Sequence, residues 1–275
     1  MDHTQQLKKK AEACLAKKAE MPMSPLFNMA NVAKRNATGD LKYLQDAVDF
    51  LVCKAKAKID FNDDDKEFLK ELYEAFWWGG QYKGYKEAAQ LANHYVNGDG
   101  NGKANPLRIN SEVYKTSKIV IATMEAMKKF ITEKKMNRKS FFEFSCNNTE
   151  FMSKSYAKIL KRMNYKTEGK MKNSGVLEAA QDNQRLHKTD GHFYLQAHSV
   201  LLPNKSIKTT WRVDSLYDFE PFEKHDYYTH IPLGQHKLIF SDGLSEYMTR
   251  IGVAKAFWYR AEWSENWVME QTKVK

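Results

Sequence analysis

The feature that most constrains the fold is a change of periodicity in the second half of the chain. In residues 206–215 ("SIKTTWRVDS") the apolar residues Ile207, Trp211 and Val213 fall on alternate positions, and polar or charged residues lie between them. This pattern is typical of a β-strand with one buried face. Residues 191–202 ("GHFYLQAHSVLL") alternate in the same way, and "LPNK" (202–205) between the runs is a turn sequence. The two runs predict a β-hairpin. Its buried face should carry Phe193, Leu195, Ala197, Ser199, Ile207, Thr209, Trp211 and Val213.

The preceding half of the chain has helical periodicity instead. Apolar residues recur every three or four positions in residues 41–58, 82–96 and 113–131, which predicts amphipathic helices. The strongest signal is 62–78 ("NDDDKEFLKELYEAFWW"), where Asn62 or Asp63 can cap a helix and acidic residues fill its first turn. We expect Gly79 and Gly80 to end this helix. The helix at 113–131 should bury Ile121, Met124, Met127 and Ile131.

After the hairpin the pattern returns briefly to helix and then to strand. Residues 242–252 ("DGLSEYMTRIG") predict a short helix that buries Leu244, Tyr247, Met248 and Ile251. Residues 254–267 ("AKAFWYRAEWSENW") predict a closing strand. The fold class is therefore α+β: a helical N-terminal half packed on a C-terminal antiparallel sheet with one covering helix.

Composition limits the classes of function. The net charge of +10 favours anionic partners such as phosphates, nucleic acid or an acidic membrane face, although a solvated basic surface explains it equally well. The basic residues are dispersed, and no nucleic-acid-binding motif accompanies them. No apolar run is long enough to span a membrane, and the first twenty residues lack the apolar core of a signal peptide. The three cysteines (Cys14, Cys53 and Cys146) are far apart and indicate reduced thiols.

Two possible sites are better explained as ordinary structure. The glycine-rich loop at 97–103 ("NGDGNGK") lacks the ligand spacing of a calcium loop and the Ser or Thr of a P-loop, so it reads as a helix C-cap and turn. The histidines have no zinc-site spacing. His192 and His198 share strand parity, so we expect them to face the same surface.

The densest ionisable chemistry lies in residues 211–225 ("WRVDSLYDFEPFEKH"). By parity, Arg212 and Asp214 point away from the buried face of the strand, and Tyr217, Asp218 and further charged residues follow. Two carboxylates can hold a divalent ion or act as a base, a cation can neutralise a leaving pyrophosphate, and a tyrosine can position it. A solvated strand end with ion pairs accounts for the same residues.

The segment "DSLYDFEPFEKH" resembles the signature of the colicin M family of bacteriocins, in which Asp-x-Tyr-Asp-Phe is followed closely by a His-Arg pair or an arginine. "LANHYVNGDGNGK", "GHFYLQAHSVLL" and "GLSEYMTRIGVAKAFWYRAEW" resemble other family segments in the same order. Residues 63–100 also resemble a group of uncharacterised bacterial proteins found near type VI secretion and polymorphic-toxin loci. The resemblance covers roughly 62–265 and implies an open, half-barrel-like sheet.

The resemblance also implies a reaction and a site. Colicin M-like toxins cleave the peptidoglycan precursor lipid II between the lipid and the pyrophosphate, with a divalent cation, here expected to be Mg²⁺. Tyr217 and Asp218 match the motif; its first Asp falls at Ser215, so Asp214 fits only through a bulge. Asp214 and Asp218 would be the metal ligands. The basic pair falls at Lys224 and His225, with His236, Lys237 and Arg250 as alternative acid-base residues.

The resemblance further implies an antibacterial effector made in the cytoplasm, delivered by a secretion machine and active in the periplasm of the target cell. Its partners would be lipid II, an immunity protein and the delivery machine, with no specific nucleic acid. Residues 1–60 would be a helical delivery segment and 61–275 the catalytic domain. Two alternatives stay open: a nuclease toxin acting in the cytoplasm, and a non-enzymatic component of a secretion system.

Overall fold

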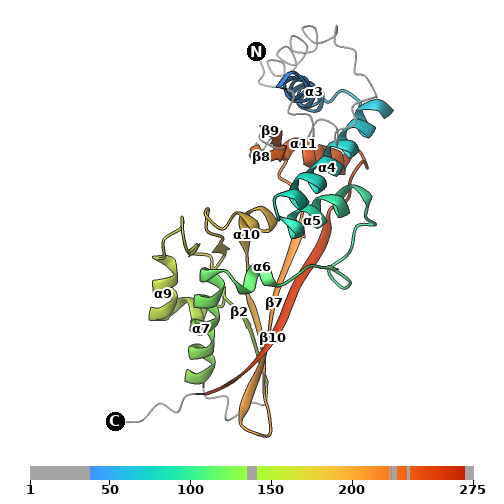
Figure 1. Ribbon diagram of the computed structural model, residues 1–275. Helices are drawn as coiled ribbons and strands as arrows, with labels where there is room; N and C mark the ends of the chain where they lie inside the picture. The colour runs from blue at the N-terminus through green and yellow to red at the C-terminus, as the bar shows by residue number, and fades with distance from the viewer. Residues whose placement is uncertain (1–37, 135–140, 223, 225–227, 234–235, 270–275) are drawn as a thin grey trace, which may run out of the picture. The chain divides into compact units, whose positions relative to one another are not determined.

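The computed structural model describes residues 38–134, 141–222, 224, 228–233 and 236–269, and it divides into two compact units (Figure 1). The first unit takes in the chain as far as Gly100, together with Tyr217–Phe257. The second takes in Asn101–Leu216 and the chain from Trp258 onward. This division is one of compactness and does not address delivery, so the predicted boundary after residue 60 stays a prediction.

The first unit is built from four helices and a β-hairpin among its described residues. The helices are α3 (Thr38–Lys56), α4 (Asp63–Tyr82), α5 (Lys86–Asn97) and α11 (Asp242–Arg250), and the hairpin pairs β8 (Tyr228–Leu233) with β9 (His236–Ser241). The Gln45 side-chain amide of α3 donates to the carbonyl of Ile239 at 3.0 Å and accepts from its N–H at 2.9 Å. This side chain satisfies both backbone groups of a β9 residue, which joins α3 to the hairpin.

Helix α4 begins as predicted but ends later. Asn62 and Asp65 form a capping box, in which each side chain accepts a hydrogen bond from the other's backbone N–H at 2.8 and 2.9 Å. The expectation that Gly79 and Gly80 end the helix is wrong, because the helix continues to Tyr82. A Cβ on Gly80 would lie 2.9 Å from the Cβ of Ala89, so the glycine permits the close approach of α5.

The second unit contains an open five-stranded sheet of order β1-β10-β7-β6-β2. The strands are Leu107–Arg108, Phe257–Val268, Ser206–Tyr217, Gln196–Leu201 and Phe141–Ser145 in that order. The α+β fold class is confirmed. The sheet is mixed, however, because β1 runs parallel to β10, whereas β6 is antiparallel to both β2 and β7.

The predicted hairpin exists between β6 and β7, but its first strand begins at Gln196, and Phe193 belongs to β5 (His192–Phe193) of a second sheet. Ala197 lies opposite Trp211 and Ser199 opposite Thr209, and every side chain predicted on the buried face is buried. Two polar members of that face satisfy each other, because the Ser199 and Thr209 hydroxyls lie 2.8 Å apart. The turn needs a positive φ, which Lys205 adopts at 65°.

A second, three-stranded sheet and several helices complete the second unit. The sheet has the order β3 (Lys170–Met171), β4 (Leu177–Glu178), β5 (His192–Phe193). The helices are α6 (Glu112–Lys115), α7 (Lys118–Glu133), α8 (Thr149–Ser153), α9 (Ser155–Lys161) and α10 (Gln184–Thr189).

Two expectations about helices need correction. In α7, Met127 and Ile131 are buried as predicted, but Ile121 is 47% exposed, and Ile119, Thr123 and Phe130 complete the buried face. The predicted covering helix exists as α11, but it belongs to the first unit, where it packs against α3 and β9. Among the described residues, no helix combines the length and the apolar character needed to cross a membrane.

A buried acid lies in the second unit. The carboxyl of Asp190 is 7% exposed and accepts a hydrogen bond from the Tyr114 hydroxyl at 3.1 Å. Burial raises the pKa of Asp190 to about 7, although hydrogen bonds with Tyr259 and Tyr114 oppose the rise. Folded Asp190 therefore keeps its proton at pH values where the unfolded chain has lost it.

We predict that Asp190→Asn flattens the pH dependence of stability between about pH 4 and pH 7. In that window the folded state holds one proton more than the unfolded state, so the free energy of unfolding falls as pH rises and levels off above the folded pKa. At about 1.4 kcal/mol per pKa unit the fall is at most about 4 kcal/mol. Urea unfolding across this range measures it, with exposed Asp182→Asn as the control. An undiminished fall in Asp190→Asn contradicts the prediction.

Candidate functional site

The predicted site residues divide between the two units, and each group has its own surroundings. Asp214 lies on β7 in the second unit. Tyr217, Asp218, Lys224, Lys237 and Arg250 lie in the first unit, together with β9, to which His236 belongs. His225 lies outside the described residues.

Asp214 is held by an arginine of the neighbouring strand. Both of its oxygens accept from Arg260, with Nη2 at 3.0 Å from Oδ2 and Nε bonded to Oδ1. The two side chains are only 6% and 13% exposed. Asp214 raises the pKa of the Arg260 guanidinium through this hydrogen bond, so the guanidinium keeps its charge.

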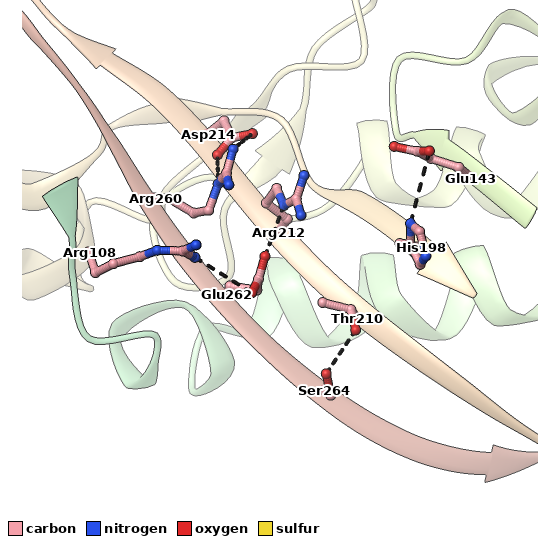
Figure 2. A network of polar contacts seen from close by, with 9 residues as sticks. All are labelled: Arg108, Glu143, His198, Thr210, Arg212, Asp214, Arg260, Glu262 and Ser264. Carbon is pink, nitrogen blue, oxygen red and sulfur yellow. Dashed lines mark hydrogen bonds and ion pairs between the residues drawn. The ribbon is translucent and has the colours of Figure 1, made fainter. Parts of the chain in front are cut away.

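Figure 2 shows that this ion pair belongs to a network along β7 and β10. Arg212 Nε lies 3.0 Å from Glu262, whose other oxygen is 3.5 Å from Arg108 of β1. Further along, the hydroxyls of Thr210 and Ser264 lie 2.9 Å apart. Thr210, Arg212 and Asp214 of β7 thus contact Ser264, Glu262 and Arg260 of β10. The residue numbers rise along one strand and fall along the other, as in an antiparallel pair.

The arrangement does not favour Asp214 as a metal ligand. Its oxygens are already occupied by a guanidinium, and a second cation there would be repelled by Arg260 and by the nearby Arg212. Within the described parts of the chain, no three His, Cys, Asp or Glu side chains are grouped so that they could hold a metal ion. The Asp214 and Asp218 pair therefore does not fit Mg²⁺, and the need for a divalent cation stays a prediction.

Tyr217 lies at the end of β7, in an aromatic cluster of the first unit. Its ring stacks on Phe257 at 5.1 Å and meets Tyr95 and Phe219 edge-on at 5.5 and 5.2 Å. The Tyr95 hydroxyl lies 2.6 Å from both the Ser245 carbonyl and the Thr249 hydroxyl of α11, which fixes the cluster to that helix. Burial raises the pKa of Tyr217, so its hydroxyl keeps its proton.

Asp218 is exposed on a loop that is anchored on both sides. We call residues 217–222 the exit segment. Phe219 packs on Tyr95 with ring centroids 5.2 Å apart. Phe222 occupies the space over Gly243, where a Cβ would come within 2.3 Å of its ring, and Lys56 Nζ lies 4.9 Å from the same ring. The aromatic side chains thus fix the backbone around Asp218.

The charges beside Asp218 affect its ionisation. Loss of hydration raises the pKa of Asp218, and the Glu220 carboxylate raises it further, while Lys224 opposes both. Lys224 Nζ also lies 3.2 Å from Glu220. The structure therefore brings Asp218, Glu220 and Lys224 into one exposed group that contains two carboxylates and one cation.

The alternative basic residues have other partners or positions. Arg250 makes an i, i+4 ion pair with Glu246 at 2.7 Å on α11. Lys237 is exposed on β9 opposite Pro232, and the structure describes only the backbone of His236, opposite Leu233. His192 and His198 do not share a sheet, since His192 is in β5 and His198 in β6, 4.0 Å from Glu143.

Two residues of the polar network, Arg260 and Glu262, were not predicted as partners of β7. They lie on the face of β10 that alternates with buried Tyr259, Ala261 and Trp263, so parity alone places them on the polar side. Their pairing with Asp214 and Arg212 depends on the register between β7 and β10, which no local pattern specifies.

Comparisons with known proteins identify no relative of this chain. No protein-family model matches it, and searches of curated proteins and of solved structures find no significant match. They therefore neither support nor oppose the resemblance to the colicin M family.

We predict that Arg260→Met lowers the free energy of unfolding by about 3–5 kcal/mol, because it leaves the Asp214 carboxylate buried without its partner. Asp214→Asn in the same chain should recover part of this loss. The matched control is Arg212→Met, whose pair with Glu262 is one-third exposed and should cost about 1 kcal/mol or less. Denaturant unfolding of the wild type and the three variants measures these values, and equal losses in Arg260→Met and Arg212→Met would refute a structural role for the Asp214 pair.

Proposed function

We propose that the protein is an antibacterial effector enzyme that hydrolyses lipid II between the prenyl chain and the pyrophosphate. The observation that carries the proposal is the position of Asp218, an exposed carboxyl of raised pKa on an anchored loop next to Glu220 and Lys224. The resemblance of "DSLYDFEPFEKH" to the colicin M signature supports the choice of substrate. A general acid works best when its pKa is shifted toward the operating pH, which is the direction observed for Asp218.

The residues of the exit segment, together with Lys224, suit this reaction. Asp218 would donate its proton to the leaving prenol oxygen while water attacks the phosphorus, and the proton lost by the water restores the carboxyl. Lys224 would neutralise charge on the pyrophosphate. Because Tyr217 keeps its proton, its role would be to donate a hydrogen bond to a phosphate oxygen and not to act as a base. The net charge of +10 favours approach to an anionic membrane surface.

We predict that Asp218→Asn reduces lipid II cleavage by about a hundredfold or more, because the amide cannot donate the proton to the leaving group. Purified protein is incubated with lipid II in Mg²⁺ or in EDTA, and the released prenol is measured by chromatography; the EDTA arm tests the divalent cation. Asp218 is exposed, so the thermal unfolding midpoint should not change. Asp64→Asn, an exposed carboxylate on α4, is the control.

The pH profile separates an acid-base role from a merely structural one. Glu220→Gln removes a charge that raises the pKa of Asp218, so the alkaline limb of the cleavage profile should move to lower pH. A wild-type protein that leaves lipid II intact in every arm refutes the substrate. Full activity in Asp218→Asn refutes the site.

The compartment of toxicity distinguishes this function from its rivals. We predict that bacteria are killed when the chain is directed to the periplasm and grow normally when it stays in the cytoplasm, because the headgroup of lipid II is cleaved outside the inner membrane. A nuclease would be toxic in the cytoplasm, and a non-enzymatic secretion component would be toxic in neither place. Colony counts after induction of the two forms measure the difference, with Asp218→Asn as the inactive control.

A further inference from the structure

A second cluster of ionisable side chains lies on the β3-β4-β5 sheet of the second unit and shares no residue with the exit segment. Lys170 lies opposite Glu178, and Glu178 lies opposite His192, so the three form one row across the strands. Lys172 follows Lys170 by two positions, which places it on the same face. The register of this small sheet therefore gathers two lysines, a carboxylate and an imidazole.

The contacts within the row converge on one nitrogen. His192 Nε2 lies 3.0 Å from Lys172 Nζ and 3.1 Å from Glu178 Oε1. Lysine can only donate and carboxylate can only accept, so the nitrogen cannot satisfy both neighbours at once. With a proton it donates to Glu178, and without one it accepts from Lys172. His192 thus has a hydrogen-bond partner in both protonation states.

The cluster has an excess of positive charge at its exposed side. Lys170 and Lys172 both approach Glu178, at 3.3 and 3.5 Å, so one carboxylate is shared between two ammonium groups. Glu178 is 11% exposed, whereas Lys170, Lys172 and His192 are 38%, 42% and 54% exposed. A ligand arriving from solvent therefore meets the cations and the imidazole and not the carboxylate.

The histidine is held from behind by buried groups. Asp190 accepts a hydrogen bond from the backbone N–H of His192, and it is itself bonded by the hydroxyls of Tyr114 and Tyr259. Tyr114 and Tyr259 are 0% and 2% exposed, so this support belongs to the core of the unit. The ring is carried on a fixed backbone, which reduces the cost of ordering it around a ligand.

We propose that Lys170, Lys172 and His192 form a binding site for a phosphate group. Its oxygens would accept from both lysines and from protonated Nε2 of His192, while Glu178 keeps its place beneath them. The phosphate can be free or part of a nucleotide. Tyr165, whose ring lies 4.9 Å from Lys170 Nζ, is the nearby aromatic surface on which a base would stack.

The chain supplies an internal control for this proposal. His198 also faces a glutamate, Glu143, and is 46% exposed, but the structure describes no lysine paired with that glutamate. The two histidines are similarly exposed, and each has a glutamate partner. They differ because two lysines pair with the glutamate beside His192. A general effect of ionic strength should act on both, whereas a phosphate site should act on His192 alone.

The experiment is a titration of the full chain, labelled with ¹³C and ¹⁵N in histidine, with inorganic phosphate at constant ionic strength and pH. We expect the ring signals of His192, assigned with His192→Gln, to shift and saturate while those of His198 stay in place. Lys172→Met and Lys170→Met should each weaken binding by about tenfold. Lys208→Met, an exposed lysine of β7, should leave it unchanged. Signals of His192 that do not saturate, or that move in parallel with His198, overturn the proposal.

A second titration with adenosine 5′-monophosphate distinguishes a site for free phosphate from a site for a nucleotide. Tighter binding than inorganic phosphate, with the excess lost in Tyr165→Leu, identifies a nucleotide; equal binding identifies the phosphate alone. Far-UV circular dichroism of each variant confirms the fold. If the Lys172→Met variant is folded and binds phosphate as tightly as the wild type, the lysines have no role in binding. Neither outcome depends on lipid II cleavage, so this site and the exit segment are tested separately.

Discussion

The pairing of β7 with β10 is the constraint on which the other described features depend. One face of the pair is apolar, with Trp211 and Val213 on β7 and Ala261 on β10, all fully buried. The opposite face is polar and carries the Asp214–Arg260 and Arg212–Glu262 ion pairs (Figure 2). A slip of one residue would bury the charges and expose the tryptophan, so the two faces together fix the register. That register also brings Tyr217 and Phe257, at the ends of the two strands, into a stacked contact.

Three aspartates show how surroundings decide what one carboxyl can do. Asp214 is nearly buried and bonded to a guanidinium, so it is a stabilising ion without free oxygens. Asp190 is buried among tyrosine hydroxyls, and its pKa of about 7 means that it holds a proton through most of the acid range. Asp218 alone combines exposure with a raised pKa, which is why the proposed acid is placed there.

Much of the fold could be predicted from the sequence because its signals are local. The alternation in β7 and the capping residues of α4 each act within a few positions, and both predictions are confirmed. The end of α4 was mispredicted because the reason for Gly80 is contact with Ala89 of another helix. The partner of Asp214 is 46 residues away, and only the strand register reveals it. The row Lys170, Glu178 and His192 was missed because strands of two residues have no detectable periodicity.

The distribution of partners explains which cations can serve a ligand. On the polar face of the large sheet the arginines are paired with Asp214 and Glu262, so they hold strands together. Lys170 and Lys172 share Glu178 between them, and a shared carboxylate cannot neutralise two ammonium groups. An anion that reached the small sheet would therefore gain attraction without breaking a structural ion pair, whereas one bound at the arginine face would have to displace a carboxylate first. For this reason a phosphate is expected to bind at Lys170 and Lys172 and not at the arginines of the large sheet.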